Sequence, residues 1–134
     1  AEREQADLVF SQALNLNEGV KTWTTGVGDA GLAAPTTTDF SFESLLNKNF
    51  IHGGTVLIRT EMMKAVGGYD ESLSVAEEYD FHLKCLHYGC RIFYTPVVVT
   101  HYRMWPGSKS VQDRLTQKEA REKMVNEIKS RYYT

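Results

Sequence analysis

Residues 66–81 read VGGYDESLSVAEEYDF, and this stretch says more about the fold than any other part of the chain. Two glycines predict a turn, a short acidic loop follows, and the run EEYD opens a helix. We expect this helix to reach Tyr88 and stop at Gly89, and to be largely buried, because apolar residues recur on two of its sides. Carboxylates gathered where a loop enters a helix are typical of proton-transfer or metal chemistry.

The acidic residues at this helix start have two interpretations. Ser74 and Glu77 have the S-x-x-E spacing of a capping box, which predicts that the helix starts at Ser74 and gives Glu77 a structural role. Asp80 and Lys84 are one turn apart and can form a surface salt bridge of little energetic weight. Glu78 is left without an obvious structural partner, so it is the candidate for a catalytic carboxylate. A well-capped helix without a site remains the alternative, because acids are favoured in any first turn.

Strands and helices alternate on both sides of this stretch. The apolar patterns predict strands over residues 7–14, 55–59 and 91–100, the last interrupted by Pro96. Ser41 is expected to cap a short helix that ends near Asn47, and Thr60 to cap a second one that stops at Gly67. A capping box at residues 116–119 opens a charged C-terminal helix that reaches about residue 131. This alternation predicts an α/β fold, a mixed sheet flanked by helices.

Composition excludes several classes of protein. The 134 residues are 42% hydrophobic and 24% charged, which is typical of a globular domain. The formal net charge of -2 gives no basic field for nucleic acid, and no apolar run is long enough to cross a membrane. Cys85 and Cys90 are the only cysteines, so we expect reduced core thiols and no disulfide framework.

Two further segments contain motifs found at binding sites. Residues 26–31, GVGDAG, match the dinucleotide pattern G-x-G-x-x-G, but they lack a good preceding strand and a following helix, so we interpret them as a loop. His101 follows an apolar run and precedes a loop with basic, serine and tryptophan residues, where it could ligate a metal or contact a diphosphate. A histidine hydrogen-bonded at a strand edge is the alternative. Trp105 could stack on a sugar or anchor its loop by burial.

Taken in order, three segments resemble family-2 glycosyltransferases of the GT-A fold. They are ADLVFS, NFIHGGTVLIRTEMMKAVGGYDESLSVAEEYDFHLKCLHYGCRIFY and HYRMWPGSKS. The family's pattern has a "vGGyDE" turn, an "ED-x-D-L" helix start, a glycine stop and a "ri-y" strand. The resemblance covers roughly residues 6–112 and corresponds to the acceptor-side, C-terminal half of such enzymes.

The resemblance implies transfer of a sugar from a nucleotide-diphosphate donor to an acceptor hydroxyl, with inversion at the anomeric carbon. Glu77 and Glu78 occupy the "ED" pair, with Glu78 as the general base and Asp80 as a supporting acid. His101 would lie at the divalent metal, Mn²⁺ or Mg²⁺, that holds the donor diphosphate in the complete enzyme. The residues implied to contact donor or acceptor are Glu77, Gly67, Gly68, Arg103, Trp105, Ser108 and Lys109.

The sequence departs from the family pattern in three places. Glu78 stands where relatives carry aspartate, and Trp105 stands where many carry the histidine of the tail motif. The nucleotide-binding N-terminal half, with its D-x-D metal motif, has no counterpart in residues 1–134, so the chain itself is expected to hold few or no metal contacts. Residues 1–112 are therefore interpreted as the acceptor-side part of a partial GT-A domain, and residues 113–134 as a charged helix outside the resemblance.

Two functions follow from the sequence. The first is a fragment of an inverting glycosyltransferase, inactive or nearly so alone, that acts on a nucleotide-sugar donor and a saccharide or lipid-linked acceptor. The second is a non-catalytic module that binds saccharide or protein on the same scaffold. The chain starts without methionine, which indicates a processed or truncated protein. We expect a cytoplasmic location, either free or at the cytoplasmic face of a membrane, and a homo-oligomer formed through an exposed sheet edge.

Overall fold

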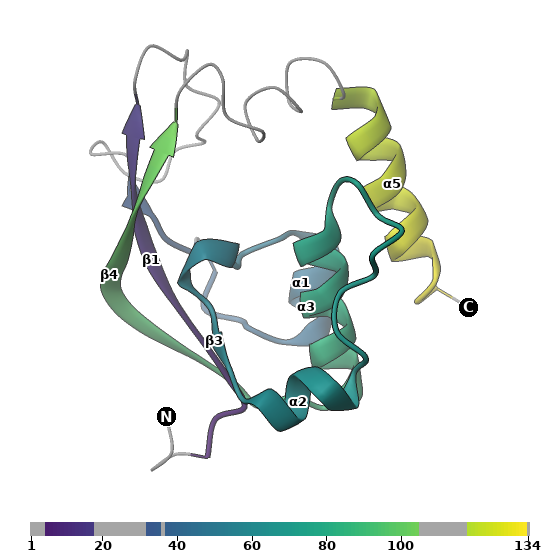
Figure 1. The fold of residues 1–134 in the computed structure, drawn as a ribbon, viewed down its shortest axis with the longest axis horizontal. Coiled ribbons are helices and arrows are strands. Elements are labelled where there is room, and N and C mark those ends of the chain that lie inside the picture. Colours follow the sequence, from purple (N-terminus) through teal and green to yellow (C-terminus); the bar gives the residue numbers. More distant parts are fainter. Residues whose placement is uncertain (1–4, 18–31, 36, 105–117, 134) are drawn as a thin grey trace.

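The computed structural model describes residues 5–17, 32–35, 37–104 and 118–133. These residues form a small α/β domain whose helices lie on one side of a mixed sheet, so the expected fold class is confirmed at this level (Figure 1). In chain order the elements are β1 (Leu8–Asn17), β2 (Leu32–Ala33), α1 (Phe42–Asn47), the 3₁₀ helix η2 (Gly53–Thr55), β3 (Leu57–Ile58), α2 (Thr60–Ala65), α3 (Glu77–Tyr88), β4 (Ile92–Met104) and α5 (Lys118–Ser130).

The first strand, β1, is the centre of a four-stranded sheet. Along one edge β1 pairs in parallel with β4, from Leu8 opposite Ile92 to Asn17 opposite Met104. Along the other edge it pairs antiparallel with β3 at residues 8–9 and with β2 at residues 13–14. Parallel neighbours need a long crossover connection, and α1, α2 and α3 all lie in the connection between β1 and β4.

The long strand β4 bends where its pairing with β1 slips (Figure 1). Two steps along β1, from Phe10 to Gln12, correspond to four steps along β4, from Tyr94 to Val98. Pro96 lies inside this bulged region. Strand pairing is interrupted there, so the missing N–H group of proline costs no hydrogen bond between the strands. The predicted irregularity at Pro96 is confirmed, and the strand continues past the predicted end at residue 100 because its last residues pair with β1.

The core fills the space between the sheet and the helices. Phe10 is fully buried at its centre, with ring centroids 5.2 Å from Phe40, 5.5 Å from Phe50 and 5.0 Å from Tyr94. Ile128 of α5 is fully buried in the same core cluster, so the C-terminal helix packs on the domain. Burying such a side chain contributes about 1.5–3 kcal/mol, so each of these contacts matters to stability.

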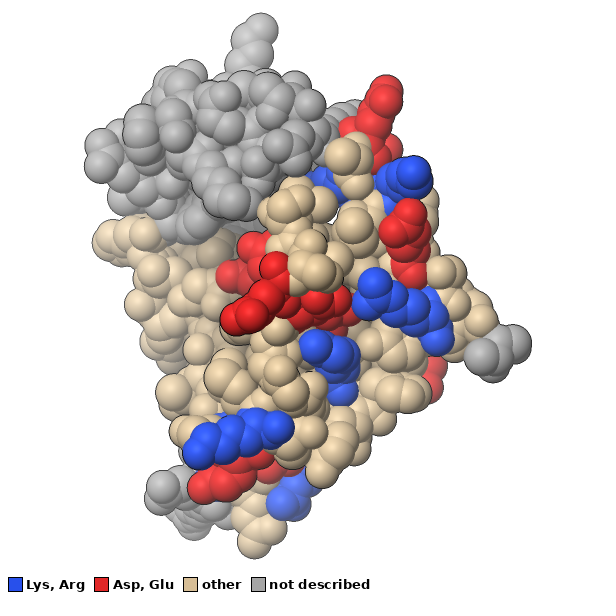
Figure 2. Space-filling view, turned by 45° about the vertical axis from the view of Figure 1, so that its right-hand side comes forward, with Lys and Arg blue, Asp and Glu red and all other residues tan. Residues whose placement is uncertain are grey.

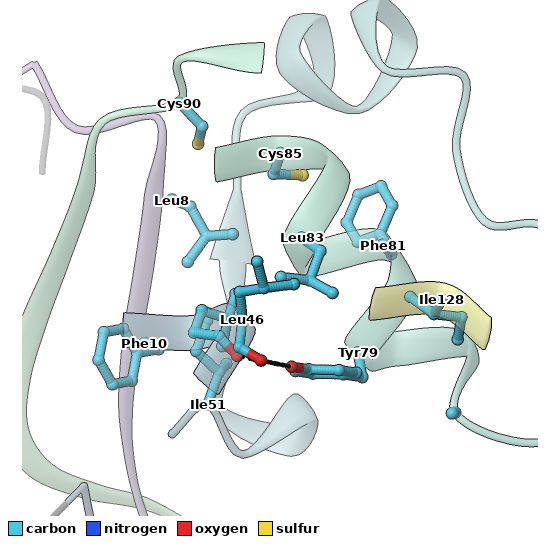
Figure 3. Packing of buried hydrophobic residues seen from close by; sticks show 12 residues of the cluster. Leu8, Phe10, Leu46, Ile51, Tyr79, Phe81, Leu83, Cys85, Cys90 and Ile128 are labelled. Atoms are coloured by element: carbon cyan, nitrogen blue, oxygen red, sulfur yellow. Dashed lines mark hydrogen bonds between the residues drawn. The ribbon is translucent and has the colours of Figure 1, made fainter. Parts of the chain in front are cut away.

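Tyr79 joins α3 to α1 (Figure 3). Its hydroxyl donates hydrogen bonds to the carbonyl oxygens of Leu45, at 2.6 Å, and Leu46, at 3.1 Å. Carbonyl groups near a helix end have no partner within the helix, so the tyrosine satisfies them inside the core. Burial raises the pKa of Tyr79 to about 12, which keeps the donating proton in place.

The predicted start of the buried helix is wrong. The helix α3 begins at Glu77, and its N-cap is Ala76, which has a left-handed backbone with φ 59° and makes no side-chain cap. Val75 and Ala76 are both buried, so packing of this turn in the core sets the helix start two residues beyond the capping box expected at Ser74. A left-handed L-residue costs about 1–2 kcal/mol, which this burial offsets.

The segment before α2 also differs from its prediction. The expected strand over residues 55–59 is shortened to Leu57–Ile58, because the glycines before it form the 3₁₀ turn η2. Thr60 is the first residue of α2 and not its N-cap, since Arg59 is still extended and donates its N–H to the Asp7 carbonyl at 2.9 Å. Sheet pairing therefore decides where this helix begins.

Several local predictions are confirmed. Ser41 caps α1 by accepting a hydrogen bond from the Ser44 N–H at 3.1 Å, and α3 stops at Gly89 with φ 110°. Cys85 and Cys90 are buried free thiols, and burial raises their pKa values to about 11 and about 12.

None of the helices in the described ranges is long and apolar enough to cross a membrane. The predicted start of the C-terminal helix at residue 116 and the residues 26–31 lie outside the described ranges.

His82 on α3 makes the stability of the fold dependent on pH. Its side chain is 2% exposed, and its Nδ1 has no hydrogen-bond partner in the described part of the chain. Burial lowers its pKa from 6.5 to about 4. Between these values the unfolded chain binds a proton that the folded chain does not, so stability is full above pH 6.5 and falls as the pH drops towards 4.

We expect the His82→Leu variant to lose this part of the pH dependence. In the wild type, the decrease in the free energy of unfolding that is attributable to His82 approaches about 3 kcal/mol at the acidic end of the window. Urea unfolding across the window measures it. Equal slopes in His82→Leu and wild type would show that this imidazole does not stay neutral in the fold.

Candidate functional site

Glu78 lies in the first turn of α3, with its carboxylate directly against the backbone of Gly53 in η2. A Cβ placed on Gly53 would lie 1.9 Å from Glu78 Oε2 and 2.7 Å from Oε1. No side chain larger than hydrogen fits there without moving the carboxylate. The φ of Gly53 is not in the left-handed region, so the nearby carboxylate, and not the backbone conformation, is what limits a side chain at this position.

The turn that carries Gly53 is fixed to the sheet by its neighbours. Thr55 Oγ1 accepts a hydrogen bond from the Ser11 N–H at 3.0 Å and donates one to the His52 carbonyl at 2.8 Å. His52 Nδ1 in turn accepts a hydrogen bond from the Gly54 N–H at 3.1 Å. The Ser11 bond attaches η2 to β1 and the other two close the turn, so the backbone beneath Glu78 is held in place.

The turn η2 under Glu78 lies beside the middle of the parallel strand pair, where Thr55 bonds Ser11 of β1. A Cβ on Gly54 would lie 3.7 Å from Thr100 Cγ2, in the second half of β4. The start of α3 is on the same side of the domain.

Compared with a carboxyl group in water, the surroundings of Glu78 stabilise its protonated form relative to its charged form. The side chain is reachable by solvent, but desolvation by the surrounding protein raises the pKa of its carboxyl, and the neighbouring charge of Glu77 raises it further. Arg121 on α5 acts in the opposite direction. A reachable carboxylate with a raised pKa can take up a proton from a substrate, as a general base does.

Asp80 faces a different side of α3. It is 1% exposed, and its Oδ1 accepts a hydrogen bond from Arg131 Nη1 at 3.3 Å. Its Oδ2 forms an ion pair with Lys84 Nζ at 3.7 Å. Because successive helix residues turn by about 100°, positions 78 and 80 point to nearly opposite sides. The Asp80–Lys84 pair suggested by the sequence exists, but its carboxylate is buried and not on the surface.

The glycine turn lies beside Asp80. Gly67 and Gly68 have φ values of 85° and 72°, a left-handed conformation that glycine adopts without strain. The Gly68 carbonyl accepts a hydrogen bond from Lys84 Nζ at 2.9 Å. The candidate residues thus form two groups, with Glu78 over η2 and with Asp80 beside the glycine turn.

The remaining candidates lie on β4 or after it. His101 is exposed and pairs through its backbone with Leu14, and Arg103 pairs in the same way with Leu16. Trp105, Ser108 and Lys109 lie outside the described residues. Within the described ranges, no three His, Cys, Asp or Glu side chains form a group that could hold a metal ion.

Two contributors to the Glu78 site did not emerge from the sequence. Gly53 was part of the resemblance but received no role, although consecutive glycines before a strand are a signal of close approach. Arg121 lies on α5, outside the resemblance, and only tertiary packing brings its charge near Glu78.

We expect the Gly53→Ala variant to fold and to move the Glu78 carboxylate away from η2. The added methyl collides with the far end of a flexible side chain, which can swing into solvent. The pKa of Glu78 should then fall back towards its ordinary value, as measured by NMR titration of the side-chain carboxyl. Gly54→Ala is the matched control, because its Cβ would approach His52 Cε1, at 3.2 Å, and not Glu78. An unchanged Glu78 pKa in Gly53→Ala would contradict the placement of this carboxylate.

Comparison with known proteins identifies no relative of the chain. No protein-family model matches it, no curated protein matches it, and no solved structure matches it. Its function is therefore inferred from the residues of the site, together with the resemblance seen in the sequence.

Proposed function

We propose that the chain is the acceptor-side part of an inverting, GT-A-type glycosyltransferase, with Glu78 as its general base. The observation that carries this proposal is the Glu78 carboxylate, held in the first turn of α3 directly against Gly53 of η2. Its accessibility and its raised pKa support a role in proton transfer. The order of the GGYDE turn, the EEYD helix start and the glycine stop supports the type of reaction.

In this reaction Glu78 acts on the acceptor hydroxyl. The carboxylate accepts the hydroxyl proton while the oxygen attacks the anomeric carbon of the donor sugar. The bond from that carbon to the diphosphate oxygen breaks on the opposite face, which inverts the configuration and releases the nucleoside diphosphate. Such general-base assistance contributes about 10²–10⁴ in rate.

Asp80 has a positioning role in this proposal. Its carboxylate accepts the guanidinium of Arg131, the residue directly after α5, and pairs with the Lys84 ammonium of its own helix. These contacts hold α5 against α3 and so keep Arg121 near the base. Asp80 does not share a side of the helix with Glu78 and does not touch the reacting atoms.

The divalent metal and the donor nucleotide belong to the proposal only through the resemblance. Among the residues that the structure describes, His101 is exposed and no carboxylate, histidine or thiol group gathers around it. We therefore derive no step through a metal, and propose that Mn²⁺ or Mg²⁺ is held mainly outside these residues. We also propose a cytoplasmic location, free or at the cytoplasmic face of a membrane.

The test is sugar transfer or sugar-nucleotide hydrolysis by the complete gene product, assayed with Mn²⁺ or Mg²⁺. Glu78→Gln should lower kcat by about 10²–10⁴, because an amide cannot accept the proton. Glu78→Asp, which restores the residue found in the family, should retain much more activity than Glu78→Gln. Glu43→Gln, at an exposed glutamate in the first turn of α1, is the matched control and should stay within about tenfold of wild type. Equal turnover by Glu78→Gln and wild type would exclude Glu78 as the base.

We also propose that the chain forms a homodimer through the outer edge of β4. In the described residues β4 pairs with β1 alone, and Val97, Val98 and Val99 are 53%, 44% and 53% exposed. An exposed apolar edge with free N–H and C=O groups favours pairing with a second strand. Sedimentation at high concentration should give the mass of a dimer, and Val98→Lys should shift it to a monomer. A monomeric wild type would contradict this assembly.

A further inference from the structure

The face of the sheet that points away from the helices carries a row of apolar side chains across three strands. Val9 of β1 lies directly opposite Leu57 of β3 on one side and Phe93 of β4 on the other. The preceding residue, Leu8, is 1% exposed in the core, and successive side chains of a strand point to opposite faces. The row therefore lies on the outer face, where Leu57 is 70% and Phe93 is 37% exposed.

A row of charged side chains lies next to the apolar row on the same face. Asp7 is two residues before Val9, and its carboxylate oxygens lie 4.0 Å from Arg59 Nε and 4.0 Å from Arg91 Nε. The side chains of Arg59 and Arg91 are 40% and 58% exposed. Two positive groups thus share one negative group, which leaves the row with a net charge of +1 and with guanidinium N–H groups that solvent can reach.

The helices do not cover these two rows. In the described part of the chain they pack against the opposite face of the sheet (Figure 1). The dimer proposed through β4 extends the sheet in its own plane, so it leaves the outer face open. The face that carries α5 presents acidic and basic side chains next to one another (Figure 2), whereas the outer face has an unbalanced charged row beside an apolar one. A sheet face with large apolar side chains is normally covered by a second layer.

The dimensions of the two rows match one α-helix. Neighbouring strands are about 4.8 Å apart, so a row across three strands is about 10 Å wide, which is the diameter of a helix with its side chains. The rows are two residues apart along the strands, about 6.7 Å, which is close to the helical pitch of about 5.4 Å. A helix that lies along the strands can therefore place apolar side chains on the first row and, one turn away, a carboxylate on the second.

The charges favour an acidic helix over a basic helix or a membrane. A carboxylate accepts hydrogen bonds from arginine N–H groups, and a net charge of +1 matches a single carboxylate. The same charge contributes only about 1 kcal/mol at an anionic lipid surface. Of the apolar side chains, Val9 is half-buried, so the row would insert little area into a bilayer.

We propose that these two rows bind an amphipathic helix with an acidic end, supplied by another protein. Its apolar stripe packs on Leu57, Val9 and Phe93, and its carboxylate pairs with the arginines. The rows lie on the other side of the sheet from α3 and Glu78, so this binding is separate from the proposed transferase activity.

The test is an amide NMR titration of the chain with a synthetic amphipathic helix of about 20 residues, with leucines along one face and a pair of glutamates in its first turn. This peptide should shift the amides of residues 7–9, 57–59 and 91–93. Leu57→Asp should weaken binding about tenfold, because it places a like charge in the apolar row. Tyr88→Asp is the matched control, since Tyr88 is also exposed, at 60%, but belongs to α3.

An exchange of charges tests the arginine row. Arg91→Glu should weaken binding of the acidic peptide about tenfold and strengthen binding of a peptide in which lysines replace the glutamates. The proposal is overturned if the acidic peptide shifts none of these amides, if Leu57→Asp binds it as well as wild type, or if the lysine peptide binds wild type more tightly. It is equally overturned if vesicles of phosphatidylcholine and phosphatidylserine bind the chain more tightly than the acidic peptide does.

Labelling of the complete gene product tests the source of the helix. Leu57→Cys should react with a hydrophilic maleimide within about tenfold of its rate after unfolding in urea, because the position is exposed. The native cysteines, Cys85 and Cys90, are buried and should stay unlabelled in the folded protein. Protection of Leu57→Cys would show that another part of the same protein covers the face, and would overturn the proposal.

Discussion

The parallel pairing of β1 with β4 is the constraint on which the other elements depend. It joins residues 8–17 to residues 92–104, so the segment between them must cross over one face of the sheet. The three helices of that crossover cover the face that carries Leu8 and Phe10. The same crossover sets η2 beside the middle of β1, where Thr55 bonds the Ser11 N–H, and brings the first turn of α3 against it. The location of the Glu78 site is thus a result of the crossover that this pairing requires.

Asp80 is the second residue on which the arrangement of the elements depends. This buried carboxylate accepts the Arg131 guanidinium and so connects the last turn of the chain to α3, while Ile128 fills the core beside it. Breaking a buried pair from one side is costly, because the remaining charge has no partner. The C-terminal helix is therefore part of the environment of the candidate base, even though it lies outside the segments that resemble glycosyltransferases.

The features that the sequence predicts well are local ones. The Ser41 cap and the Gly89 stop depend on a few neighbouring residues, and each is found where the pattern places it. The start of α3 was misjudged because burial of Val75 and Ala76 outweighs the capping signal at Ser74. The contact between Glu78 and Gly53 and the bond between Asp80 and Arg131 join residues far apart in the chain, which helical periodicity cannot bring together. The sequence therefore identified Glu78 as a candidate, but not what surrounds it.

The contact between Glu78 and Gly53 has an evolutionary consequence. A glutamate at position 78 reaches far enough to occupy the space of a side chain at position 53. An aspartate is one methylene shorter and would vacate part of that space. Glycine at 53 and glutamate at 78 are therefore best regarded as one inherited unit. A chain with the shorter acid at position 78 can accept a larger residue in the turn directly, whereas a chain that keeps the glutamate can do so only by moving its carboxylate away from the turn.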